Sequence, residues 1–145
     1  MQPQNITPRQ IRTLETSLLT GPVLFAVVVG FLTAGDPSPQ DVGLPEFLPW
    51  GFAVFAVASL PIAFFAGRAV RGAVPASGGR HSSRRARARM VSMAVLEAAM
   101  LANLTMWLAT REQWPSAVAA LLPFCGGLAQ LLTPLRSDDD ASAAL

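Results

Sequence analysis

The chain is 145 residues long, and 52% of its residues are hydrophobic while only 14% are charged. Soluble domains usually carry about 25% charged residues, so this composition excludes an ordinary soluble domain and predicts one all-α membrane domain. All eleven basic residues are arginines and the net charge is only +2. The net charge therefore predicts little, whereas the positions of the arginines along the chain predict the orientation of the helices in the membrane.

The single cysteine and the single histidine limit the chemistry of the chain. Cys125 lies in an apolar run, where we expect it to pack as a small residue, and one cysteine forms neither a disulfide within the chain nor a cysteine metal site. His81 has no histidine or carboxylate cluster beside it. Nucleophile, phosphate-binding and zinc motifs are absent from the sequence, so we expect neither an enzyme nor a cofactor.

The first predicted span follows a polar segment, residues 1–15, which we expect to be cytoplasmic. Residues 16–35 carry no charge, and a helix of that length at about 1.5 Å per residue crosses a hydrocarbon core of about 30 Å. A cleaved signal peptide is the alternative, because Arg9 and Arg12 precede the run and small residues end it. The run exceeds the roughly 7 to 15 apolar residues of a signal peptide, which favours an uncleaved helix.

Three further apolar runs complete a predicted bundle of four membrane helices. They are residues 47–67, 90–110 and 113–135. Pro61 predicts a kink in the second span, and Pro123 predicts a bend in the fourth. Residues 36–46 carry three acids and no base, as an exposed loop does, and residues 136–145 form an acidic tail that we expect to be disordered.

The segment between the second and third spans gives the strongest orientation signal. Residues 68–89 contain seven arginines and no acid. Because basic loops stay in the cytoplasm, this loop and, after four crossings, both termini are predicted inside. Trp50, Trp107 and Trp114 then fall at the outer ends of their spans, where an aromatic belt is expected. The alanine-rich, lysine-free composition is typical of a GC-rich bacterium, so we expect the bacterial inner membrane.

Glu97 is the one acid placed inside an apolar run. A charged acid near the helix centre costs on the order of 3 kcal/mol, so Glu97 should face the bundle interior, find a partner or keep its proton. Gln130 on the fourth span lies in the same half of the membrane and is the candidate partner, whereas Asn103 points to another face of the third helix. Glu97, Asn103 and Gln130 are therefore polar packing groups or an ion site.

Small residues mark the predicted helix contacts. Ala94, Ala98 and Ala102 recur every four residues and form a smooth strip, which packs within the chain or mediates an oligomer. Gly126 and Gly127 predict close approach of a neighbour to the fourth helix. Five arginines of the basic segment have two possible roles. They contact anionic lipid headgroups, or they only set the orientation of the chain in the membrane. These arginines are Arg80, Arg84, Arg85, Arg87 and Arg89.

Two resemblances rest on short motifs of the second half. The residues from Ala94 to Leu101, Trp107 to Thr110 and Leu132 to Arg136 resemble a family of small, uncharacterised bacterial proteins with four membrane spans. That resemblance implies a membrane fold and no activity. Glu97 with its following small residues is also similar to the proteolipid subunit of rotary ATP synthases, which implies a proton or cation carrier at Glu97.

We therefore expect a non-enzymatic accessory or assembly subunit that packs against other membrane subunits or itself. Translocation of protons or cations by Glu97 is the alternative, and binding of anionic lipid is a third possibility. Nucleic-acid binding is not expected, because no aromatic interleaving accompanies the basic residues.

Overall fold

The computed structural model describes residues 8–35, 43–72 and 81–133. Over these ranges the secondary structure is helical, without a strand, which confirms the all-α part of the predicted fold class. The helices are α1 (Pro8–Ala34), α2 (Leu48–Gly72), α3 (His81–Thr110) and α4 (Ser116–Leu132). The predicted tail at 136–145 and most of the loop at 36–46 lie outside the described residues.

Three of the helices are long and apolar enough to cross a membrane, as a multi-pass membrane protein requires. The stretches are Arg9–Ala34, Leu48–Val70 and Ala86–Thr110. The fourth helix is apolar but has only 17 residues, a length of about 25 Å.

The helix ends differ from the predicted span ends. α1 begins at Pro8 instead of residue 16, and α3 begins at His81 instead of residue 90. Arginine is a good helix former, so a helix includes basic residues that precede the apolar run that hydropathy detects.

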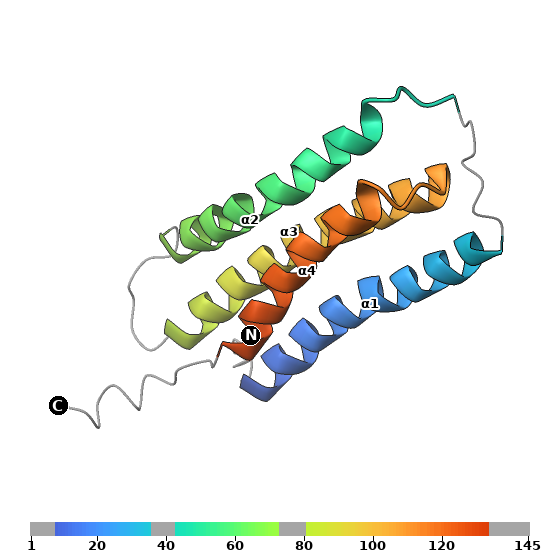
Figure 1. Ribbon diagram of the computed structural model, residues 1–145. Helices are drawn as coiled ribbons and strands as arrows, with labels where there is room; N and C mark the ends of the chain where they lie inside the picture. Colours follow the sequence, from blue (N-terminus) through green and yellow to red (C-terminus); the bar gives the residue numbers. More distant parts are fainter. Residues whose placement is uncertain (1–7, 36–42, 73–80, 134–145) are drawn as a thin grey trace.

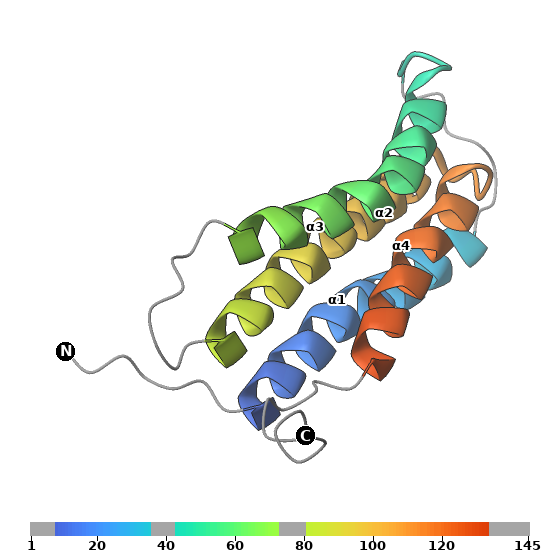
Figure 2. The same cartoon turned by 90° about the vertical axis from the view of Figure 1, so that its left-hand side faces the viewer.

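The third helix lies at the centre of the bundle. α1 and α2 flank α3 on opposite sides and α4 packs on α3 between them (Figures 1 and 2). Within the described ranges α1 and α2 do not touch each other. Side-chain hydrogen bonds from Ser92 to the carbonyl of Ala63 and from Asn103 to the carbonyl of Phe52 show that α2 and α3 are antiparallel.

Small residues form the contact between α2 and α3. The buried face of α2 consists of Ala56, Ser59, Ala63 and Gly67. Ser92 Oγ donates a hydrogen bond of 2.6 Å to the carbonyl of Ala63, one turn from Gly67. Such small residues let two helix backbones approach closely, which is how helices associate in lipid, where the hydrophobic effect does not drive them together.

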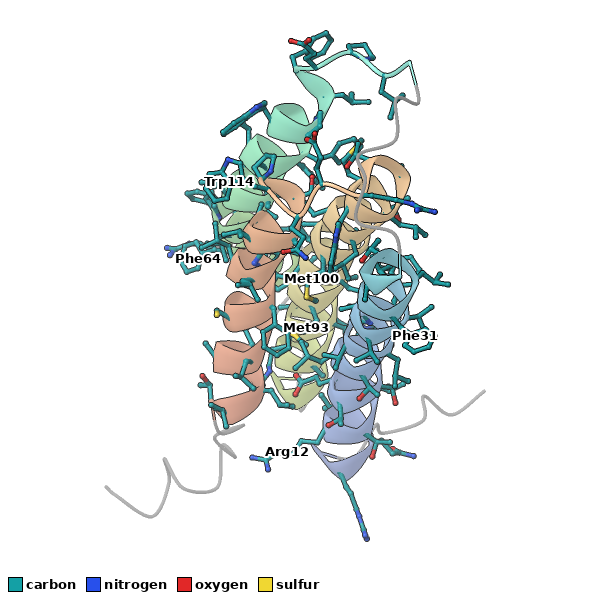
Figure 3. The ribbon with its side chains drawn as sticks, turned by 45° about the vertical axis from the view of Figure 1, so that its right-hand side comes forward. Arg12, Phe31, Phe64, Met93, Met100 and Trp114 are labelled. Atoms are coloured by element: carbon teal, nitrogen blue, oxygen red, sulfur yellow. The ribbon has the colours of Figure 1, made fainter. Side chains whose placement is uncertain are left out.

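Many large apolar side chains lie on the outer surface of the bundle. Phe31 is 82% exposed, and both Phe31 and Phe64 project away from the bundle (Figure 3). The interior instead holds alanines, hydroxyl groups and a cluster of Leu19, Met93 and Met100. This distribution suits a protein whose solvent is the lipid hydrocarbon.

Most of the arginines in the described ranges lie at the end of the bundle opposite Trp50 and Trp114, with Arg111 as the exception at the tryptophan end. Arg12 lies at one end and Trp114 at the other (Figure 3). At the second end the rings of Trp50 and Trp114 pack edge to face, with centroids 6.1 Å apart. This separation of arginine from tryptophan is the pattern on which the predicted orientation depends.

Replacing Gly67 with alanine should destabilise the α2–α3 contact. A Cβ atom there would lie 2.5 Å from Ser92 Oγ and 3.2 Å from the carbonyl oxygen of Ala88, so we expect Gly67→Ala to lower the free energy of unfolding by about 1 to 3 kcal/mol. Gly51→Ala, in the same helix with open space around it, should be neutral or stabilise by up to about 1 kcal/mol. Unfolding in mixed detergent micelles, followed by circular dichroism, compares them; equal stabilities would contradict the close contact.

Candidate functional site

A buried ion pair joins α1 to α3. Glu15 Oε1 lies 2.6 Å from Arg89 Nε, and Arg89 Nη2 donates to Glu15 Oε2 at 3.1 Å. Glu15 is fully buried and the Arg89 side chain is 14% exposed. The guanidinium thus contacts both carboxylate oxygens, with one hydrogen bond from Nη2 to Oε2 and a close charge contact between Nε and Oε1.

Arg89 also binds the end of α4. Its Nη1 donates to the carbonyl of Thr133 at 2.9 Å, and its Nη2 donates to the carbonyl of Gln130. The last carbonyls of a helix have no partner within the helix; the carbonyl of Gln130 also accepts a bond of 3.2 Å from the backbone N–H of Thr133, so the arginine adds a second donor there. One guanidinium therefore holds α1, α3 and α4 together at the arginine-rich end of the bundle.

The ion pair differs from the sequence interpretation, which assigned Glu15 to a polar segment and Arg89 to a loop that contacts lipid headgroups. Both residues are helical, and Arg89 is occupied by protein groups. One sequence signal was available. Glu15 is the only acid in residues 1–35, and Arg89 is the last arginine before the third apolar run.

Removing the charge of Glu15 should strongly destabilise the bundle. Glu15→Gln leaves the Arg89 cation buried without its counter-ion, and we expect a loss of about 3 to 5 kcal/mol in the free energy of unfolding. Glu112→Gln removes an exposed carboxylate near the other end and serves as the control, with little expected change. Similar stabilities of the two variants in a detergent unfolding titration would show that the ion pair does not hold the helices.

Glu97 lies at the seam between α3 and α1. The side chain is half-buried, and its Oε1 lies 3.7 Å from the position that a Cβ atom on Gly21 would take. Gln130 instead lines a cavity of about 290 Å³ beside Leu60 and Phe64 of α2. No hydrogen bond joins Glu97 to Gln130 or to another residue of the described ranges, because the two side chains lie on different sides of α3.

Asn103 forms a polar contact inside the bundle. The residue is fully buried, and its Nδ2 donates to the carbonyl of Phe52 at 3.0 Å and to the carbonyl of Ala99 at 2.9 Å. The first of these bonds joins α3 to α2. Asn103 is therefore separate from Glu97, and the structure does not bring the two together as one site.

The alanine strip of α3 faces outward. Ala94 and Ala98 are exposed and Ala102 is half-buried. Gly21 of α1 is exposed and lies next to Glu97 at the seam, and the exposed Ser17 lies one helical turn before Gly21. We call this surface the α1–α3 outer face; it consists of Ser17, Gly21, Ala94, Glu97 and Ala98.

The glycine pair of α4 lies where α4 meets two neighbours. A Cβ atom on Gly126 would lie 2.7 Å from Leu60 of α2, and one on Gly127 would lie 2.8 Å from Leu19 of α1. Both neighbouring atoms are the ends of flexible leucine side chains. At both glycines, therefore, leucine side chains of the neighbouring helices pack directly against the backbone of α4.

The five arginines considered for lipid contact are placed as follows. Arg80 and the side chains of Arg84 and Arg85 lie outside the described part of the structure. Arg87 is exposed, whereas Arg89 is held in the ion pair.

Comparison of the chain with models of protein families, with curated proteins and with solved structures finds no match. Function is therefore inferred from the geometry of the chain itself.

Proposed function

We propose that the protein is a non-enzymatic, multi-pass subunit of the bacterial inner membrane that associates laterally, with copies of itself or within a larger membrane complex. The proposed contact surface is the α1–α3 outer face. The observation that carries the proposal is the outward position of Ala94 and Ala98, since neither alanine is used for packing between the helices of the chain.

The outer face suits packing against another helix. Its small side chains allow a second backbone to approach closely, which favours dispersion contacts in lipid. The hydroxyl of Ser17 donates to the carbonyl of Thr13 on its own helix, and Thr20 bonds Thr16 in the same way. The polar groups of α1 are thus satisfied before a partner arrives.

Glu97 adds a reason for a partner at this face. A carboxyl group that meets lipid without a hydrogen-bond partner is costly, and Glu97 has no such partner in the described ranges. A neighbouring helix would exclude lipid from the carboxyl group and offer it hydrogen-bonding groups. Lateral association therefore lowers the cost of keeping an acid at this depth.

The proposal includes four crossings with both termini in the cytoplasm. The basic segment 68–89 and the position of the tryptophans support this orientation. The 17 residues of α4 meet the lower limit of about 17 residues for a membrane-spanning helix.

Cysteine crosslinking in native membranes tests the contact surface. In a Cys125→Ala background, which removes the exposed native thiol, we expect Ala98→Cys to form crosslinked dimers or a crosslink to a defined partner. Val57→Cys, on the exposed face of α2, is the matched control and should give little product. Equal crosslinking at the two positions would rule out the outer face as a specific interface.

Translocation of protons or cations is the second candidate function. It is favoured by one observation: Glu97 lies at the rim of the bundle with no ion pair in the described ranges, so its carboxyl group is not committed to a fixed charge. The similarity of this stretch to the proteolipid subunit of rotary ATP synthases agrees with such a role.

Ion flux into proteoliposomes separates the two functions. If Glu97 is the carrier, wild-type protein should conduct above protein-free liposomes, and Glu97→Gln should lose the flux while keeping the crosslink through residue 98. If Glu97 serves only in packing, neither protein should conduct. Flux that survives Glu97→Gln would exclude Glu97 as the carrier.

A further inference from the structure

A second feature of the bundle is an apolar cavity between α1, α3 and α4. Its volume is about 370 Å³, within the range of small-molecule binding sites. The walls include Val23, Ala26 and Val27 of α1, Trp107 of α3, and Ala117 and Leu121 of α4. Val23, Val27 and Leu121 are exposed, so the cavity opens on the outer surface of the bundle, where lipid lies.

Trp107 gives this cavity a preference for a ligand that carries a hydrogen-bond acceptor. Its indole Nε1 is buried and has no acceptor among the described residues, and a buried N–H without an acceptor is costly. Of the residues that line the cavity, Trp107 alone carries a side-chain N–H or O–H donor. The other edge of the ring faces α1, because its Cη2 lies 3.7 Å from the position of a Cβ atom on Gly30.

The depth of Trp107 matches the interface of a bilayer. The residue lies three positions before Thr110, which ends both α3 and its apolar stretch, a distance of about 4.5 Å along the helix. Tryptophans concentrate at this level, where the apolar chains of lipids meet their polar headgroups.

We propose that the cavity is a binding site for one phospholipid, whose acyl chain lies between α1 and α4 and whose ester carbonyl accepts a hydrogen bond from Trp107 Nε1. The apolar walls suit the methylene groups, and the ester oxygen supplies the acceptor that the indole lacks. This inference depends on the membrane location of the chain and not on lateral association through the α1–α3 outer face, so either can fail alone.

Native mass spectrometry of the protein in a maltoside detergent, which has no ester, tests the site. We expect wild-type protein to retain one added phospholipid per chain. Trp107→Phe keeps the ring and removes the donor, so binding should weaken about 2-fold to 10-fold, the value of one hydrogen bond. Trp114→Phe is the matched control, because Trp114 is exposed and does not line the cavity. Equal lipid retention by the two variants would overturn the proposal.

A cavity-filling variant tests the location. Ala26→Phe places a ring into the space from α1 and should abolish lipid retention, whereas Ala58→Phe adds the same ring at a half-buried position of α2 away from the cavity. Lipid retention by a folded Ala26→Phe protein would contradict the site.

Fluorescence gives a readout that needs no cavity variant. With Trp50 and Trp114 replaced by phenylalanine, Trp107 alone should be quenched by a phospholipid brominated on its acyl chains, reaching saturation near one lipid per chain. A protein that keeps only Trp114 should instead show quenching that follows the bulk lipid fraction. If Trp107 also follows the bulk fraction, the cavity holds no specific lipid.

Discussion

The guanidinium of Arg89 is the group on which the arrangement of this bundle most depends. It binds the Glu15 carboxylate of α1 and the last carbonyls of α4 while it belongs to α3. An arginine this poorly exposed is stable only when its charge and its donors are satisfied, so the three helices have to meet at one point. The second helix is held differently, by small residues and by hydrogen bonds from Ser92 and Asn103 to its backbone.

The helical class and the three helices long and apolar enough to cross a membrane follow from the sequence, because hydropathy is a local property of each run of residues. Helix ends are less predictable, since the basic residues in the first turns of α3 are poor membrane residues yet good helix formers. The contacts are less predictable still. Glu15 and Arg89 are separated by 74 positions, and the partners of Asn103 are main-chain carbonyls, which every residue possesses and no side-chain pattern identifies.

The alanine strip of α3 also shows what the sequence pattern does not predict. Its spacing predicts a smooth helix face, and the structure has one, but spacing does not say whether that face is turned inward or outward. The inward small-residue contact is made by α2, where Ala56, Ser59, Ala63 and Gly67 are mixed with large apolar residues. In the structure α4 packs on α3 between α1 and α2 (Figure 2), and Ala94 and Ala98 are exposed.

The lack of contact between α1 and α2 has a consequence for how the protein is made. The N-terminal part of a chain is synthesised first, so α1 and α2 leave the ribosome before α3 does. Over their described ranges these two helices do not contact each other, and the cation that pairs with Glu15 belongs to α3. The first half of the chain thus lacks the contacts of the bundle, and the arrival of the third helix is the event that joins the separate helices.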